Sequence, residues 1–434
     1  MIQRLLSAAL LSLLGLIGPA AASELSEAIA RLDALLQAPD RQQASALADQ
    51  LVRRHVAIGR FTQATFDGYL EESLEIYEDL LDGPHFQKLV AHYREHLIEA
   101  YRNRLVADLS DLLTSPGLQG LRLDELNING RRGRADLRAL FPDGPIALKA
   151  NLALVDSSWK IAEVTIDGRH ISAHYRRRYR DAIDESYSLP VLEAQLGERD
   201  FIVIDDFTAT WDGHRPMDWG PWKDKDKQKP MLYRIEQSGD RHYMTARDST
   251  YSVIVGKFVH WNPRHYPIMT WCWRANALPL GGNEFLDDQN DSAAGLYVIF
   301  SKFLGIPKQL KYVWSTTLPE GTVGRRNKIF RPWFFVVESG EAKLGKWTFE
   351  TVDLEKDYRA KLGNRPANRT IGLGLLTDAN STRSYAEAYS ADLRAWTREA
   401  LDDGRIANHC EGLPKKPPRN ARGATTGSAY GAEE

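Results

Sequence analysis

The spacing of apolar residues changes near residues 196–200, and this change predicts two successive domains of different fold class. Before it, apolar side chains recur every three or four residues over long stretches, which is typical of amphipathic helices. After it, short alternating runs follow one another with turn residues between them, which is typical of all-β domains. We predict an α+β domain followed by an all-β sandwich, most simply a jelly roll.

The first domain is predicted to place its helices before a small antiparallel sheet. Helices are expected up to about residue 113, and the longest, at about 86–113, carries a stripe of leucine and aromatic side chains. Short strands are expected within 121–129, and a strand pair within 146–166. An aromatic stripe of this kind usually packs in a protein core, but it can also line a lipid pocket.

The stretch at residues 159–183 predicts a strand, a tight turn and a helix. Asp167-Gly168 is a strong turn signal, and Ile171, Tyr175 and Tyr179 then recur every four residues opposite a run of arginines. With the tyrosine-bearing long helix before it, this order of features resembles the MlaC family, also called the toluene-tolerance family. The resemblance covers roughly residues 30–196 and implies a periplasmic phospholipid-binding domain, with helices and a curved sheet around an apolar cavity.

This resemblance implies a lipid-binding domain at residues 24–197 and a pocket lined by apolar side chains of its helices and sheet. Each candidate lining residue could equally belong to an ordinary core. The candidates are Phe66, Leu70, Tyr93, Leu97, Tyr101, Leu148, Leu152 and Tyr175.

Residues 1–22 predict the compartment. Arg4 precedes an apolar run from Leu5 to Ile17, and small residues follow up to Ala22, which is the pattern of a cleaved secretory signal peptide. The apolar run is short for a membrane span. We therefore expect cleavage after Ala22 and a periplasmic or secreted protein. At the other end, residues 412–434 are rich in Pro, Gly, Ala and charge, and they are expected to be a disordered tail.

The chain has two cysteines, Cys272 and Cys410. In an oxidising compartment they could form one disulfide that closes a loop of more than a hundred residues. The alternative is a buried thiol on a strand and a separate thiol near the tail, because a sequence gives no distance between them.

The second domain, predicted at residues 200–400, resembles a family of bacterial secreted proteins whose function is unknown. The resemblance covers about residues 200–396 and implies a β-sandwich fold without an assigned activity. The matching motifs are I-D-D-F-T (Ile204–Thr208), Y-P-x-M-T-W-x-W-R (Tyr266–Arg274), D-D-Q-N-D (Asp287–Asp291), Y-V-W (Tyr312–Trp314), D-Y-R (Asp357–Arg359) and G-L-L-T-D-A-N-S-T (Gly374–Thr382).

Several acids of the second domain fall at predicted strand ends and loops. Loop carboxylates of this kind can hold calcium, and Asp205, Asp291 and Asp378 are the candidates. Capping of turns by solvated acids is the simpler interpretation. We otherwise expect no cofactor. No nucleophile elbow, phosphate-binding loop or dinucleotide-binding glycine pattern occurs, so we also expect no enzyme. A pair of acids acting on a sugar is the remaining catalytic possibility.

These features predict a lipid carrier. The expected ligand is a phospholipid or other acyl lipid, moved between membranes by a soluble component of an ABC-type lipid transport system, with inner- and outer-membrane transport complexes as partners. A formal net charge of −2 argues against nucleic acid. The alternative is a carbohydrate-binding or carbohydrate-active protein with its site in the sandwich, where tryptophans such as Trp271 and Trp333 could stack on a glycan. A purely structural envelope protein is a third possibility.

Overall fold

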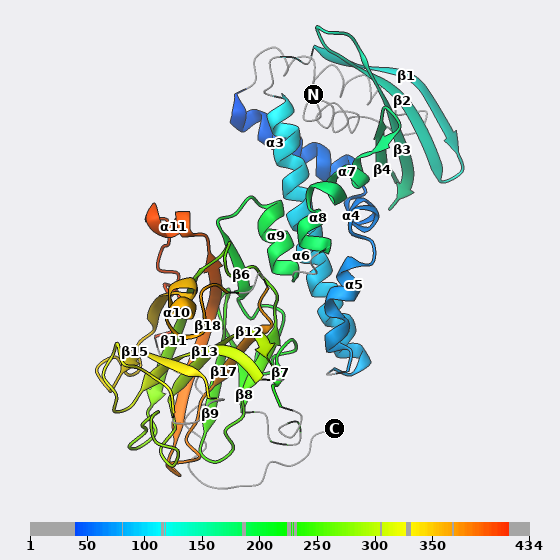
Figure 1. Ribbon diagram of the computed structural model, residues 1–434. Coiled ribbons are helices and arrows are strands. Elements are labelled where there is room, and N and C mark those ends of the chain that lie inside the picture. The colour runs from blue at the N-terminus through cyan, green and yellow to red at the C-terminus, as the bar shows by residue number, and fades with distance from the viewer. Residues whose placement is uncertain are drawn as a thin grey trace. The chain divides into compact units, whose positions relative to one another are not determined.

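The computed structural model divides into two compact units (Figure 1). The helix–sheet unit lies within residues 1–79 and 86–199, and the β-sandwich unit lies within 80–85 and 200–434. The signal peptide predicted at 1–22 and the tail beyond residue 415 lie outside the described residues. The structure describes residues 40–79, 81–113, 117, 119–184, 188–223, 227, 229, 232–303, 306–326, 331–366 and 369–415.

The helix–sheet unit contains helices that precede and follow one antiparallel sheet, whose strands pair in chain order from β1 to β5. Within the described residues, none of the helices is long and apolar enough to cross a membrane. The helices are α3 (Arg41–His55), α4 (Ile58–Phe66), α5 (Tyr69–Leu74), η2 (Glu75–Tyr77), α6 (Gly83–Leu113), α7 (Ile171–Arg178), α8 (Arg180–Asp184) and α9 (Leu189–Leu196). The strands are β1 (Gly120–Asn129), β2 (Arg132–Leu140), β3 (Ile146–Val155), β4 (Ser158–Ile166) and β5 (Arg169–His170).

A short connection ties the end of α3 to the sheet. Helix α3 begins after Asp40, whose side chain caps it by accepting the backbone amides of Gln42 and Gln43. It ends at His55, and the next residue, Val56, forms a parallel bridge with Ile161 of β4. The amide of Ala57 donates to the Ile161 carbonyl at 2.8 Å. These backbone bonds fix the turn between α3 and α4 against the sheet.

The aromatic stripe of α6 forms the centre of the core. Tyr101 is fully buried, and its ring packs against Phe61, Phe66 and Tyr175 at centroid distances of 6.1, 5.3 and 5.1 Å. Its hydroxyl lies 3.0 Å from the hydroxyl of Thr65. Packing of this stripe therefore joins α6 to α4 and α7.

Two features of the sheet differ from the prediction. The strands expected within 121–129 are one continuous strand, β1, with a bulge between Leu123 and Glu125. Strand β2 was not predicted, because the residues between its charged side chains are mostly small and give a weak apolar pattern. One face of β2 nevertheless packs inward through Ala135, Leu137 and Ala139.

The β-sandwich unit is built from a seven-stranded sheet, in the order β14-β15-β13-β12-β17-β10-β7, and a second sheet, in the order β16-β11-β18-β9-β8, to which β6 adds beside β18. Strands β13 and β15 run parallel, and the other pairs are antiparallel. The elements are β6 (Phe201–Asp205), β7 (Gly220–Pro221), β8 (Tyr233–Ser238), β9 (Arg241–Asp248), β10 (Val255–Phe258), β11 (Ile268–Ala277), β12 (Ala294–Phe303), β13 (Ile306–Ser315), β14 (Val323–Gly324), β15 (Trp333–Ser339), β16 (Thr348–Asp353), α10 (Leu354–Lys361), β17 (Gly372–Leu376), β18 (Ala386–Trp396) and α11 (Arg398–Asp402).

Tryptophans join the two sheets of this unit. On β11, the rings of Trp271 and Trp273 face those of Tyr312 and Trp314 on β13, at centroid distances of 5.7 and 6.0 Å. The predicted order, an α+β domain followed by a β-sandwich, is confirmed. The jelly-roll connection stays a prediction.

A disulfide fastens the last described segment to the sandwich. Cys272 of β11 is bonded to Cys410, with 138 residues of separation and Cα atoms 5.6 Å apart. Of the two alternatives left open by the sequence, the structure has the disulfide. Leu413 packs beside it in a buried cluster with Tyr243 and Tyr389, so the segment after α11 covers part of the outer face of this sheet.

Candidate functional site

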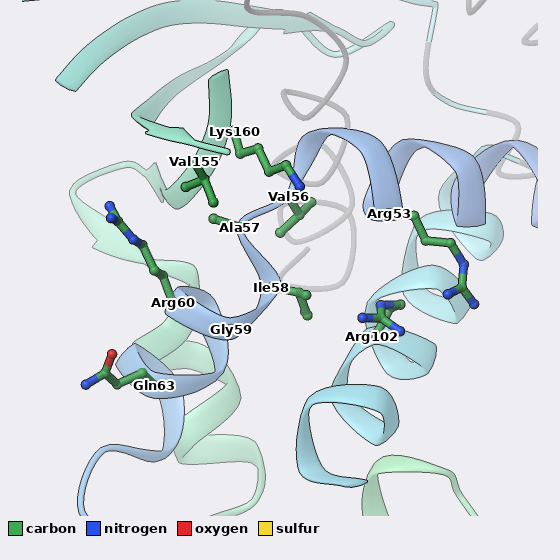
Figure 2. A pocket seen from close by; sticks show the side chains of 10 residues that line it. All are labelled: Arg53, Val56, Ala57, Ile58, Gly59, Arg60, Gln63, Arg102, Val155 and Lys160. Atoms are coloured by element: carbon green, nitrogen blue, oxygen red, sulfur yellow. The ribbon is translucent and has the colours of Figure 1, made fainter. Parts of the chain in front are cut away.

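A hollow of about 540 Å³ lies in the helix–sheet unit where α3, α4 and α6 approach the β3–β4 hairpin (Figure 2). This size is within the range of small-molecule sites. We call it the basic hollow, because four of its lining side chains carry positive charge above an apolar floor. The lining residues are Arg53, Val56, Ala57, Ile58, Gly59, Arg60, Gln63, Arg102, Val155 and Lys160.

Local backbone geometry places these cations together. The fixed turn between α3 and α4 puts Arg53 on one side and Arg60 on the other. The β3–β4 hairpin turns at Asp156 and Ser157, both with positive φ, as a tight two-residue hairpin requires. This turn brings Lys160 of β4 over the same apolar floor.

The charge of the basic hollow is only partly balanced. Arg53 pairs with Asp49 at 2.8 Å and lies 3.8 Å from Glu99, which also pairs with Arg102. Within the described parts of the chain, Arg60 and Lys160 have no ion pair or side-chain hydrogen bond, and the Nε of Arg102 is buried without a hydrogen-bond partner. The hollow therefore has unused donors and a surplus of positive charge for an anion.

His55, at the end of α3, does not add to this charge at neutral pH. Burial, followed by the charges of Arg54 and Lys160, lowers its pKa to about 4. The surplus of positive charge thus rests on arginine and lysine, which stay charged throughout the physiological range.

A second hollow of about 720 Å³ shares Gly59 and Gln63 with the basic hollow. Among its described lining residues, the one basic side chain is that of Arg94, and it is paired with Glu71 at 3.0 Å, so this hollow carries no comparable surplus of charge. Its lining is apolar in part and polar at the rim. The residues are Gly59, Thr62, Gln63, Phe66, Asp67, Gly68, Leu70, Glu71, Arg94, Leu97 and Ile98.

The lipid-pocket residues predicted from the sequence fall in two places. Phe66, Leu70 and Leu97 line the second hollow. The other five are buried in the core of the unit and line neither hollow. They are Tyr93, Tyr101, Leu148, Leu152 and Tyr175.

The cations of the basic hollow were missed, because they come from three helices and a strand that are far apart in the sequence. Only the run Arg53-Arg54-His55, closely followed by Arg60, could have drawn attention to it. That these residues lie close to Lys160 depends on the tertiary fold.

Tyr175 belongs to a buried polar network that holds α6 and α7 together. Its hydroxyl donates to Asp108, which also accepts from Arg104 at 2.5 Å and from Arg178 at 3.3 Å. We expect Tyr175→Phe to lower the free energy of unfolding by about 1–3 kcal/mol, because the partly buried carboxylate of Asp108 loses a donor. Urea unfolding measures this loss. Lipid binding by the folded variant should be unchanged, and a selective loss of binding would place Tyr175 in the pocket instead.

The three predicted calcium ligands do not form a common site. The carboxylate of Asp205 accepts from Lys257, the Trp219 indole and the Phe207 amide, at 2.7, 2.6 and 2.6 Å. Asp291 and Asp378 lie near each other in another part of the unit, and Asp291 accepts the amides of Ser381 and Thr382. Across the described residues, no group of three or more His, Cys, Asp or Glu side chains could hold a metal ion.

The Asp291–Asp378 pair makes stability depend on pH. Burial, with the charge of Asp291 second, raises the pKa of Asp378 to about 7. Because the folded-state pKa lies above the unfolded value, stability falls as pH rises from about 4 through 7.

We expect Asp378→Asn to remove this contribution. The free energy of unfolding of this variant minus that of wild type should be roughly 2 kcal/mol larger at pH 7 than at pH 5. Urea titrations at both pH values measure the difference, and a pH-independent offset would contradict it.

Of the two tryptophans named for glycan stacking, Trp271 is 1% exposed, so its ring is not offered to a ligand. Its neighbours in the core, Trp273 and Trp314, are equally buried. Trp333 is half-buried, and the cations of Arg325 and Lys361 lie within 5.0 and 4.7 Å of its ring centroid.

Comparisons with known proteins give a family match within the sandwich and similar solved structures. Residues 217–394 match the family described as "Protein of unknown function (DUF3047)", which assigns no activity to the sandwich. No curated protein matches the chain. Among solved structures, one similar to this chain is a phospholipid-binding protein from Ralstonia solanacearum in complex with a phospholipid. It is 15% identical, with a TM-score of 0.31, and the match covers 39% of this chain and 89% of that one.

Proposed function

We propose that the helix–sheet unit binds an anionic acyl lipid, such as a phospholipid, and carries it between membranes through the periplasm. In this role the protein is the soluble component of an ABC-type lipid transport system. The observation that carries the proposal is the basic hollow, in which unpaired cations surround an apolar floor. The resemblance of residues 30–196 to the MlaC family supports the same ligand class.

The cations suit the headgroup. A phosphate offers several acceptor oxygens, and charge-assisted hydrogen bonds from guanidinium and ammonium groups are stronger than neutral ones. Arg60 and Lys160 are free to make such bonds without breaking an ion pair among the described residues. The buried Nε of Arg102 would gain a hydrogen-bond acceptor from the same phosphate.

The apolar surfaces suit the chains. Keeping an acyl chain out of water is worth about 0.8 kcal/mol per methylene group, so even a partly covered chain gains from the floor of the basic hollow. Val56, Ala57 and Ile58 form this floor together with Val155. The second hollow, which begins at the shared Gly59 and Gln63, extends the surface toward Phe66 and Leu70.

The chemistry of the basic hollow favours binding without turnover. Its described lining contains arginine, lysine, glutamine and apolar residues, and no side chain among them can act as a general base at neutral pH. The proposed function is therefore that of a carrier.

A lipid extraction assay tests the proposal. The mature protein is mixed with vesicles that contain fluorescent phosphatidylglycerol, and the vesicles are then removed by centrifugation. We expect labelled lipid to remain in the supernatant and to co-elute with the protein in gel filtration. Supernatant without labelled lipid, from a protein shown to be folded, would contradict the carrier function.

A further inference from the structure

Four cations gather around the edge of the seven-stranded sheet in the β-sandwich unit. We call this surface the cationic edge. In it, Arg325 and Lys361 lie against the ring of Trp333, Arg326 follows Arg325 in the chain, and Arg331 lies close enough to Arg326 for their charges to interact. Strand β14 is the edge strand, and Trp333 begins its neighbour β15.

The positive charges at this edge are poorly compensated. Arg326 pairs with Asp287 at 2.9 Å, whereas Arg325, Arg331 and Lys361 form no ion pair with any described residue. Burial, and then the charge of Arg331, lowers the pKa of Arg326, which reflects the crowding of cations. Asp357 lies near enough to Lys361 for the two charges to interact, and with Asp287 it leaves the four cations in local excess.

Exposed apolar side chains lie beside these cations. Val323 of β14 is 39% exposed, and Phe285 and Leu286, from the loop after β11, are each 44% exposed. Phe285 packs against Phe334 with ring centroids 5.0 Å apart and lies against Gly324, so it borders the same edge strand. Val323 and Phe285 therefore border the edge strand that Arg325 and Arg326 directly follow.

We propose that the cationic edge docks the protein on a membrane surface that carries anionic phospholipid headgroups. Cations attract such headgroups, and tryptophan favours the boundary between headgroups and acyl chains. Exposed Leu286 and Val323 gain by entering that boundary, whereas a soluble polyanion would leave them in water. Arg325 and Lys361 already lie 5.0 and 4.7 Å from the centroid of the Trp333 ring, so a sugar would compete with these cations for stacking on it. The proposal does not depend on the ligand of the helix–sheet unit.

Co-sedimentation with vesicles tests this assignment. The full mature chain should bind vesicles of phosphatidylglycerol mixed with phosphatidylcholine, and bind phosphatidylcholine alone much more weakly. Near an anionic surface each cation contributes about 1 kcal/mol, which is roughly fivefold in partitioning. The double variant R325Q/R331Q should therefore bind about 25-fold more weakly than wild type. Raising the salt concentration should weaken wild-type binding as well.

Two controls separate this surface from other sources of binding. The variant R215Q/K346Q removes two exposed cations elsewhere in the same unit and should bind like wild type. Leu286→Ser should reduce vesicle binding but leave binding to dextran sulfate unchanged. Equal vesicle binding by wild type and R325Q/R331Q would overturn the proposal. The proposal would also be overturned if R325Q/R331Q bound dextran sulfate more weakly than wild type but bound vesicles equally well.

Discussion

Replacing Arg60 and Lys160 together by glutamate is expected to abolish lipid binding by the helix–sheet unit. The two side chains supply the unpaired positive charge of the basic hollow, and the variant R60E/K160E would present two carboxylates to the headgroup instead. Loss of two charge-assisted hydrogen bonds, each worth about 1.5–3 kcal/mol, predicts at least roughly hundredfold weaker binding. Because neither residue has an ion pair among the described residues, the fold should change little.

A matched control separates the effect of changing the hollow from the effect of changing the net charge. Arg54 lies exposed on α3 and Lys149 lies exposed on β3, and neither lines the hollow. The variant R54E/K149E changes the net charge by the same amount on neighbouring elements. Titration with a fluorescent phosphatidylglycerol should show wild-type affinity for R54E/K149E and a large loss for R60E/K160E. Similar affinities for both variants would remove the basic hollow as the headgroup site.

The largest effect on stability is expected at Lys257 in the β-sandwich unit. Lys257 is 4% exposed, and its ammonium contacts Asp205 at 2.7 Å and Asp218 at 2.6 Å. Removing it leaves two buried carboxylates without their cation. We expect Lys257→Ala to lower the free energy of unfolding by about 3–5 kcal/mol.

The matching control removes the carboxylates as well. In the triple variant K257M/D205N/D218N, no buried charge is left unpaired, so much of the lost stability should return. Urea unfolding followed by tryptophan fluorescence measures both variants, because the buried tryptophans of the sandwich report on its folding. A triple variant no more stable than Lys257→Ala would show that the loss comes from packing and not from charge.

The fold was predicted from the sequence where local patterns are strong. The long helix α6, the β3–β4 hairpin with its Asp156 and Ser157 turn, and strand β18 follow directly from periodicity and turn residues. Strand β2 was missed, because its inward face is built from small residues that carry a weak signal. Helix α10 was also missed, because it is short and follows β16 directly.

Pocket-lining residues are harder to predict from a sequence than the fold, for a physical reason. An apolar stripe is visible in the sequence, but whether it packs in a core or lines a hollow depends on what faces it. Tyr101 and Tyr175 pack against other core side chains, and Leu70 and Leu97, which are also buried, border the second hollow. The basic hollow depends on bringing Arg53, Arg60, Arg102 and Lys160 together from separate elements, which no local pattern records.

Native mass spectrometry of the mature protein, purified from a Gram-negative periplasm, tests the central claim most directly. We predict a stoichiometric mass increment that lipid extraction identifies as an anionic phospholipid, and we predict that this increment is absent from R60E/K160E. A wild-type protein with the mass of the bare chain, even after incubation with phosphatidylglycerol vesicles, would contradict the lipid-carrier account.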